Sequence, residues 1–273
     1  MPAIQINDTN LHVETNGSGP PLVLLHGGLG LDHTYFRPAF DQLADRATLV
    51  YYDHRGNGRS DRPADYGAEM TLDQLVADTV GLLDHLGHEQ AVVLGHSYGG
   101  FLAQLLAAAH PDRLRGLILC NTVPAFDYQP APSGTDEQLA AFGAAFSGPM
   151  ADDEAWHQTW STIWPMYFHR WDAAEAARVD AGTHYVAEAW NTAAGLLATF
   201  NTIDQLPGID VPTLVVSGRH DFITPPEPGG DRIAGLLPNA ELAVFEDSGH
   251  YPFMEEESAF FARLGQFLDG LPA

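Results

Sequence analysis

Residues 91–100 read AVVLGHSYGG, and this stretch decides the fold. It begins as a short apolar run typical of a buried strand, and residues 101–109 (FLAQLLAAA) continue as a helical pattern. A serine between two such elements must lie on a very tight turn. Glycine is needed on both sides of it, because a Cβ at Gly95 or Gly99 would collide with the adjoining strand or helix. The pattern predicts that Ser97 is a nucleophile, held at the carboxyl edge of a sheet and the amino end of a helix.

Further apolar runs lie on both sides of this stretch, and most are followed by helical patterns or glycine-rich loops. Strands are expected at residues 3–6, 11–14, 22–25, 48–52, 114–120, 213–217 and 241–245. Helices are expected at residues 35–43, 71–86 (with Thr71 as the N-cap), 231–237 and 256–268. This alternation predicts an α/β fold with a mostly parallel central sheet flanked by helices.

The alternation stops between residues 123 and 205, where proline and glycine separate helical stretches and no strand pattern is convincing. We expect an inserted helical cap here, over the carboxyl edge of a core domain formed by residues 1–122 and 206–273. The segment holds all five tryptophans: Trp156, Trp160, Trp164, Trp171 and Trp190. Because the first three recur every four residues, one helix is expected to present an aromatic face. That face would dock the cap on the core, line a pocket, or do both.

Composition limits the class of partner. The 273 residues suffice for one domain with an insertion, and the net charge of −24 argues against nucleic acid or an anionic membrane as partner. All twelve basic residues are arginines, which excludes Schiff-base and Ser-Lys chemistry. Cys120 is the single cysteine and is expected to be a small buried hydrophobe, so neither an internal disulfide nor a metal site is expected.

The cellular location is also an expectation from the sequence. No run approaches the twenty apolar residues of a membrane span. Residues 1–8 lack the positive and apolar regions of a signal peptide, so a cytoplasmic location is expected. The expected partner is a small-molecule or short peptide substrate, with no cofactor.

A nucleophilic serine needs a base, and the base needs an orienting acid. His250 follows the last expected strand directly, at the same edge as Ser97. His26 is a rival, but the tight glycine loop beside it favours a buried histidine bonded to the backbone. Asp221 follows the strand at 213–217 and completes the chain order Ser97, Asp221, His250, whereas Asp247 lies too close to His250 in sequence to fold back onto it.

These motifs resemble the α/β-hydrolase family. Residues 26–30 (HGGLG), 53–60 (DHRGNGRS), 95–100 (GHSYGG), 218–221 (GRHD) and 248–253 (SGHYPF) stand in the family's order, and they are most similar to the proline iminopeptidase branch. The resemblance implies a catalytic triad of Ser97, Asp221 and His250. It also implies an oxyanion hole formed by the backbone N–H groups of Gly28 and Tyr98, one from the glycine loop and one following the nucleophile. The charged loop at 53–60 is expected to brace the site through ionic and hydrogen-bonded pairs.

Three positions depart from the proline iminopeptidase pattern: Leu29 replaces a proline, Tyr98 a tryptophan, and Phe222 an acidic residue that some members use to hold the substrate's amine. Such differences are common in relatives that cleave esters, lactones or N-acyl amides. We expect substrate contacts from the core and the cap, with Glu188 as a possible anchor for an amine. The expected residues are Gly27, Leu29, Trp164, Tyr167, Phe168, Glu188, Phe222 and Tyr251.

The sequence therefore predicts a serine hydrolase that cleaves a small ester or amide through an acyl-enzyme, resembling proline iminopeptidase. A carboxylesterase, or an acylase or lactonase acting on N-acyl-homoserine lactones, is an alternative. Two further alternatives keep the fold: carbon–carbon bond hydrolysis or a lyase reaction, and a ligand-binding relative with a vestigial triad.

Overall fold

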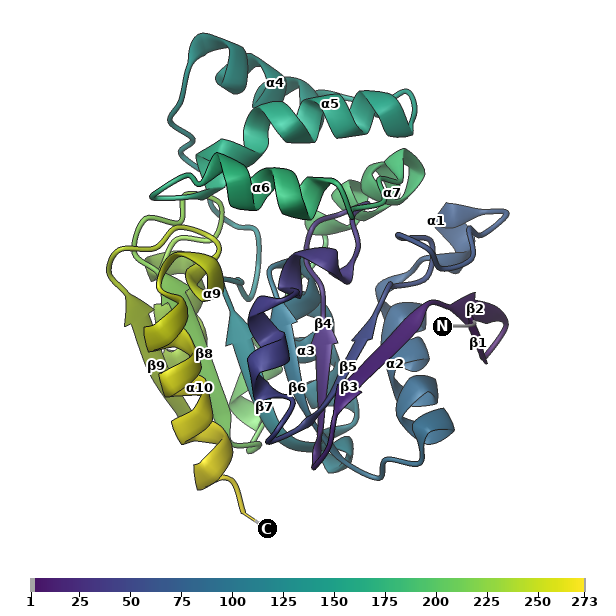
Figure 1. The fold of residues 1–273 in the computed structure, drawn as a ribbon, viewed down its shortest axis with the longest axis vertical. Helices are drawn as coiled ribbons and strands as arrows, with labels where there is room; N and C mark the ends of the chain where they lie inside the picture. Colours follow the sequence, from purple (N-terminus) through teal and green to yellow (C-terminus); the bar gives the residue numbers. More distant parts are fainter. Residues whose placement is uncertain (1–2, 273) are drawn as a thin grey trace.

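The computed structural model describes residues 3–272 and has a seven-stranded sheet at its centre (Figure 1). The strand order is β3-β5-β4-β6-β7-β8-β9, with β3 antiparallel to β5 and every other pair parallel. The strands are β3 (Val13–Gly17), β4 (Pro21–Leu25), β5 (Thr48–Tyr52), β6 (Ala91–His96), β7 (Leu114–Cys120), β8 (Thr213–Gly218) and β9 (Ala240–Phe245). The predicted fold class, a mostly parallel α/β sheet flanked by helices, is confirmed.

The amino-terminal strands differ from the prediction of two edge strands at 3–6 and 11–14. Strand β1 (Ile4–Ile6) pairs with β2 (Thr9–Leu11) in a separate two-stranded sheet, and the main sheet begins at Val13. Asn7 adopts a positive φ of 52° in the turn between them. A turn this short folds the chain back on itself, so the hairpin pairs internally instead of extending the main sheet.

Helices cover both faces of the main sheet (Figure 1). Helices α2, α3 and α8 lie on one face, while η1, η2, α9 and α10 lie on the other. Their bounds are α2 (Leu72–Leu86), α3 (Tyr98–Ala109), α8 (Arg232–Leu236), η1 (His33–Phe36), η2 (Ala39–Leu43), α9 (Pro252–Glu255) and α10 (Glu257–Gly270). The remaining short elements outside residues 123–205 are α1 (Tyr66–Glu69), η3 (Pro111–Arg113), η5 (Leu206–Gly208) and η6 (Glu227–Asp231). Thr71 caps α2 as predicted, accepting a hydrogen bond from the Gln74 N–H.

The predicted helix at 35–43 is replaced by the two short 3₁₀ helices η1 and η2. Pro38 separates them and restricts the residue before it, and Arg37 is extended (φ −103°, ψ 146°). Proline also has no N–H to donate to a continuous helix. The helix therefore stops at Phe36, and a second helix begins at Ala39.

A layer of helices lies over the carboxyl ends of the strands (Figure 1). This helical layer consists of α4 (Asp136–Ser147), α5 (Asp153–Ile163), η4 (Trp164–Tyr167), α6 (Ala173–Asp180) and α7 (Ala187–Leu197). The expected aromatic helix through Trp164 is interrupted, because α5 ends at Ile163 and Pro165 lies in the first turn of η4. The division into a core and a cap spanning 123–205 stays a prediction.

Burial is greatest in the central strands, where β6 is buried throughout and Cys120 ends β7 within the core. Such strands are continuous apolar runs because helices cover both of their faces. Among residues 3–272, none of the helices combines the length and the apolar character needed to cross a membrane.

Candidate active site

Ser97 lies between β6 and α3 with φ 54° and ψ −119°, a backbone conformation that residues other than glycine rarely adopt. Its N–H donates to Cys120 O (2.9 Å), and its carbonyl accepts from Thr122 Oγ1 (2.9 Å). Bonds to the neighbouring strand therefore hold the strained turn. Ser97 is half-buried, whereas the residues on either side of it are buried.

The two glycines of the turn are required for the reason that the sequence suggested. A Cβ on Gly95 would lie 2.3 Å from Gly99 O, and a Cβ on Gly99 would lie 2.0 Å from Leu25 O. Both contacts are with backbone atoms, so no side-chain movement can relieve them. The turn packs tightly against β4 as a result.

Asp221 follows β8 and is buried, at 3% exposure. Its Oδ1 accepts from the N–H groups of Ile223 (3.0 Å) and Thr224 (3.1 Å). Its Oδ2 accepts from Asn121 Nδ2 (2.8 Å), Thr224 Oγ1 (2.5 Å) and His250 Nδ1 (2.7 Å). Burial alone would raise the pKa of Asp221, but the attraction of His250 and these side-chain hydrogen bonds outweigh it and lower the pKa to about 2.

His250 follows β9 and is held from several sides. Its N–H donates to Tyr167 O (2.7 Å), and its carbonyl accepts from His96 Nε2 (2.8 Å). Its Nδ1 carries the proton that is donated to Asp221, since an ionised carboxylate only accepts. When Nδ1 carries the one ring proton, Nε2 is an acceptor, which is the form that a general base requires.

Ser97 and His250 line the same cavity, which has a volume of about 60 Å³ and lies between the sheet edge and the helical layer. Seven of the predicted site residues form part of its wall: Gly28, Leu29, Ser97, Tyr98, Tyr167, His250 and Tyr251. The remaining lining residues are Phe101, Phe126, Phe146, Trp160, Trp190, Leu197, Ile223 and Thr224. No aspartate, glutamate or arginine is among them, so the wall is aromatic and apolar around a few polar atoms.

The predicted oxyanion-hole residues, Gly28 and Tyr98, lie on this wall. Gly28 has φ +67°, and a Cβ there would meet Leu31 Cδ1 at 2.4 Å. Tyr98 is the first residue of α3, and the first N–H groups of a helix have no partner within it. One candidate backbone donor therefore comes from the glycine loop and one from the start of α3.

Five of the predicted substrate contacts lie elsewhere. Gly27 packs against Ser97, where a Cβ would meet Ser97 Cβ at 2.7 Å. Trp164 and Phe168 line a separate groove of about 220 Å³ between the helical layer and α9, whose Met254 and Glu255 also line it. Phe222 is half-buried, with its ring 5.2 Å from that of Tyr167, and Glu188 is exposed on α7. The helical layer lines the cavity with Phe146, Trp160 and Trp190, which were not among the expected contacts, beside Tyr167, which was.

The helical layer docks directly on the glycine loop. Trp156 Nε1 and the Val186 N–H both donate to Gly30 O, at 3.2 and 2.9 Å. His184 donates from its backbone to Asp32 Oδ2 (2.9 Å), and its Nδ1 lies 3.0 Å from the same oxygen. Trp156 is fully buried, so this tryptophan serves docking, whereas Trp160 and Trp190 line the cavity.

His26, the alternative base, is a buried histidine bonded to the backbone, as the sequence suggested. Its Nδ1 donates to Gly27 O (2.8 Å), and its Nε2 accepts from the His54 N–H (3.1 Å). Both ring nitrogens are occupied, and His26 does not line the cavity. Asp247, the alternative acid, is exposed.

The charged loop at 53–60 braces the structure, as expected. Asp53 is fully buried; its Oδ1 bonds His33 Nδ1 (2.6 Å), and its Oδ2 accepts from the N–H and Nε of Arg59 (2.9 and 3.1 Å). Arg55 donates twice to Asp78 of α2, at 2.8 and 2.9 Å. These pairs fasten the loop to η1 and α2.

Two residues that support the acid were not predicted, Asn121 and Thr224. Asn121 directly follows β7 at the same sheet edge and has a positive φ of 46°; its Nδ2 bonds both Asp221 and Gly249 O (3.1 Å). Thr224 reaches Asp221 from three residues further along the chain. Two features of the sequence could have indicated them: Asn121 directly follows a strand, and Thr224 lies three residues after Asp221.

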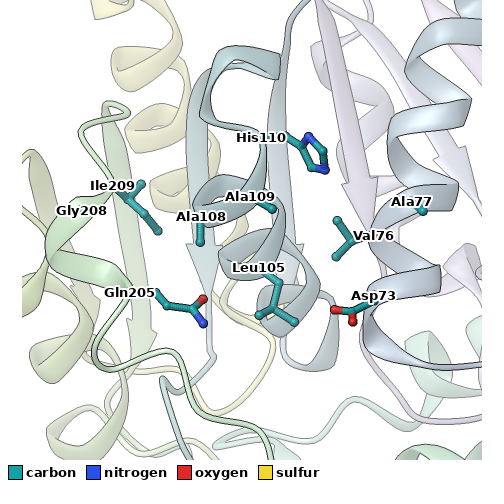
Figure 2. A pocket seen from close by; sticks show the side chains of 10 residues that line it. All are labelled: Asp73, Val76, Ala77, Leu105, Ala108, Ala109, His110, Gln205, Gly208 and Ile209. Carbon is teal, nitrogen blue, oxygen red and sulfur yellow. The ribbon is translucent and has the colours of Figure 1, made fainter.

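A second hollow lies at the far end of α3, between α2 and η5 (Figure 2). Its lining includes Asp73, Leu105, His110 and Gln205, and its volume is about 600 Å³. None of the predicted catalytic residues lines it. Among residues 3–272, no group of three or more His, Cys, Asp or Glu side chains is arranged to hold a metal ion.

Comparison with protein families finds one match over most of the chain. A family model described as the alpha/beta hydrolase fold matches residues 20–257. That range includes the glycine loop, the turn at Ser97, Asp221 and His250.

Individual relatives share about a third of their residues with this chain. A proline iminopeptidase of Lactobacillus helveticus (strain DPC 4571) is 31% identical, covering 92% of this chain and 90% of that protein. A 2-hydroxymuconate semialdehyde hydrolase of Pseudomonas sp. (strain CF600) is 30% identical, covering 95% of this chain and 90% of that protein. Among solved structures, the enol-lactonase of Burkholderia xenovorans LB400 superposes with a TM-score of 0.80 at 27% identity, covering 98% of this chain and all of that chain.

Proposed function

We propose that this chain, which belongs to the α/β-hydrolase fold family, is a serine hydrolase that cleaves a small uncharged ester or lactone through an acyl-enzyme on Ser97. The observation that carries the proposal is the shared cavity. It brings together a strained serine, a histidine with Nε2 free to accept, and a wall without carboxylates or guanidinium groups. Hydrolase relatives at about 30% identity support the reaction class.

In the proposed mechanism His250 Nε2 removes the Ser97 hydroxyl proton as Ser97 Oγ attacks the substrate carbonyl. The N–H groups of Gly28 and Tyr98 stabilise the negative charge that develops on the carbonyl oxygen. Each such donor contributes roughly a hundred- to a thousandfold in rate. The imidazolium then protonates the leaving alcohol, and the acyl group stays on Ser97.

The second half repeats these steps with water as the nucleophile. His250 removes a proton from the water, which attacks the acyl carbonyl, and the proton then returns to Ser97 as the acid leaves. Asp221 keeps the proton of the neutral imidazole on Nδ1 and stabilises the imidazolium when it forms. Its lowered pKa keeps it ionised throughout.

The cavity wall distinguishes between ester and aminopeptidase substrates. A substrate with a free α-amine brings a cation into the pocket, and burying an unpaired cation is costly. The wall offers no carboxylate to pair with it, and Glu188 is exposed on α7. Uncharged esters and lactones are therefore compatible with this lining. Release of an amino-terminal residue is the second candidate, because several relatives are proline iminopeptidases.

Two serine variants and a substrate panel test the proposal. We expect Ser97→Ala to lose at least about a thousandfold in turnover of short p-nitrophenyl esters. Ser217→Ala is the matched control, because Ser217 is buried in β8 and its hydroxyl has no hydrogen-bond partner among residues 3–272. This control should keep wild-type turnover.

The panel compares p-nitrophenyl acetate and butyrate, a lactone, proline β-naphthylamide and its N-acetylated form. Preference for esters or the lactone, with no gain from the free amine, supports the proposal. A tenfold or greater preference for the unblocked prolyl amide over its acetylated form would replace it with the aminopeptidase assignment. Equal ester turnover by Ser97→Ala and wild type would remove Ser97 from the mechanism.

A further inference from the structure

A buried chain of three hydrogen bonds passes beneath the nucleophile, from the glycine loop to the loop that carries His250. The Gly27 N–H donates to Tyr35 Oη (2.6 Å), Tyr35 Oη bonds His96 Nδ1 (2.9 Å), and His96 Nε2 bonds His250 O (2.8 Å). Tyr35 lies on η1, and His96 directly precedes Ser97. These hydrogen bonds thus connect three segments that are far apart in the sequence: the glycine loop with η1, the end of β6, and the loop of His250.

The two ends of the chain fix the direction of every bond. A backbone N–H only donates, so Tyr35 Oη accepts from Gly27. A carbonyl only accepts, so His96 donates to His250 from Nε2. In the neutral ring this is the one ring proton, so His96 Nδ1 accepts the proton of Tyr35 Oη. Burial, together with the nearby His250, lowers the pKa of His96 well below its usual value and keeps the ring in this form.

The intermediate side chains are packed in apolar surroundings. Tyr35 and His96 are buried, and the ring of Phe253 lies 6.0 Å from that of Tyr35 and 5.2 Å from that of His96. Hydrogen bonds in such surroundings are electrostatically stronger than in water, and a donor or acceptor left without a partner is costly. The chain therefore resists separation of its ends.

We infer that Tyr35 and His96 are positioning residues that tie the oxyanion loop to the loop of the catalytic base. Gly27 immediately precedes Gly28, the proposed oxyanion donor, and the His250 carbonyl belongs to the proposed base. This relay of hydrogen bonds holds the donor and the base in a fixed position relative to each other. This inference rests on the proposed serine-hydrolase mechanism, in which both groups must act on one substrate carbonyl.

The size of the effect follows from how catalysis depends on geometry. Misplacing a catalytic group by about 1 Å costs roughly a hundredfold in rate. Tyr35→Phe leaves the Gly27 N–H without an acceptor and His96 Nδ1 without a donor, while the ring still fills its site. We expect kcat on a p-nitrophenyl ester to fall roughly 10- to 100-fold with KM changed less than about threefold.

Tyr52→Phe is the matched control. Tyr52 is as deeply buried as Tyr35, and its hydroxyl bonds Thr79 Oγ1 of α2 (2.9 Å), outside the relay. This variant should lower the melting temperature comparably yet keep kcat within about threefold. His96→Gln is the second variant: its side-chain amide retains a donor for the His250 carbonyl, so it should keep more activity than His96→Leu.

A spectroscopic measurement separates positioning from stability. The proton between His250 Nδ1 and Asp221 gives a downfield proton NMR signal, identified by its loss in Asp221→Asn. We expect this signal to shift or broaden in Tyr35→Phe and to stay unchanged in Tyr52→Phe. The relay is refuted if Tyr35→Phe and His96→Leu keep wild-type kcat, or if both tyrosine variants lose activity in proportion to their lost stability.

The same measurements distinguish the relay from the proposed function. If wild type neither hydrolyses esters nor reacts with a fluorophosphonate, the serine-hydrolase proposal fails. The NMR signal then tests the relay alone. A signal that is perturbed in Tyr35→Phe and unchanged in Tyr52→Phe supports the physical coupling between the loops, whereas a signal unchanged in both variants refutes it.

Discussion

Asp221 shows how one residue is tuned by the groups around it. It is buried, yet five hydrogen bonds and the neighbouring imidazole keep it ionised and lower its pKa to about 2. Asp221→Asn removes the charge while nearly preserving the shape. We expect kcat on a p-nitrophenyl ester to fall roughly a thousand- to ten-thousandfold, because the imidazole loses its preferred tautomer and the imidazolium its partner. A loss below about tenfold in steady-state assays would contradict the assigned role.

The same residue predicts a dependence of stability on pH. Because the folded-state pKa of Asp221 lies below the usual value of 3.8, ionisation stabilises the folded protein above about pH 4, and this contribution disappears as the pH falls towards 2. A shift of this size corresponds to roughly 2 kcal/mol. Urea unfolding at pH 7 and at pH 3 should therefore show a smaller stability difference between wild type and Asp221→Asn at the lower pH. A stability difference between the two proteins that grows towards acid pH would contradict a lowered pKa of Asp221 in the folded state.

Among single residues, those that directly follow a strand can be placed from the sequence. Ser97, Asp221 and His250 each follow a parallel strand, so a common sheet edge could be inferred. Asn121 could not be assigned, because its contact with Asp221 depends on a left-handed backbone conformation at φ 46°. Glu188 was expected inside because amine recognition needs a carboxylate, but its place on α7 exposes it.

Among the elements, the turn between β6 and α3 tolerates the least change. We expect Gly99→Ala to lower the free energy of unfolding by at least about 3 kcal/mol, since its Cβ would lie 2.0 Å from Leu25 O. Gly143 of α4 is the control, because it is exposed in a helix and a Cβ there has nothing within 4 Å. Gly143→Ala should raise stability by about 0.5–1 kcal/mol through better helix propensity.

Urea unfolding of both glycine variants checks this contrast. If Gly99→Ala keeps wild-type stability, the packing of α3 against β4 described above is wrong. If Gly143→Ala destabilises by more than about 1 kcal/mol, the exposed position assigned to it on α4 is wrong.

Strands are predicted better than short helices, for a physical reason. The buried strands β5 (Thr48–Tyr52) and β7 (Leu114–Cys120) have the predicted bounds, because continuous apolar runs have few alternatives. The helix expected at 35–43 breaks into η1 and η2 at Pro38, and the aromatic helix ends before Pro165. Amphipathic periodicity continues across both prolines, but a proline has no N–H for a helical hydrogen bond, and each helix is interrupted there.

At the scale of the molecule, the net charge of −24 acts against compactness. Salt screens repulsion among the exposed carboxylates, so we expect the melting temperature at pH 7 to rise by several degrees between 20 mM and 1 M NaCl. Near pH 4 the carboxylates are partly protonated and the gain should shrink. Differential scanning fluorimetry at both pH values measures it. An unchanged or lower melting temperature at pH 7 would show that ion pairs outweigh repulsion.

The architecture as a whole could be predicted, but the contacts between its layers could not. Alternation of strands and helices predicts the parallel sheet, and its interruption at 123–205 predicts helices above it. The docking of Trp156 and Val186 on Gly30 joins residues more than 120 positions apart, and no local pattern encodes it. The hairpin of β1 and β2 was missed for a different reason: its pairing is local and depends on the turn at Asn7, where φ is 52°.

The central claim is that Ser97 forms a covalent intermediate, and mass spectrometry after reaction with a fluorophosphonate tests it most directly. Peptide mapping should place one adduct on Ser97 in wild type and in Ser217→Ala, slow adduct formation in Asp221→Asn, and none in Ser97→Ala. An adduct on another serine, or undiminished labelling of Ser97→Ala, would contradict the mechanism.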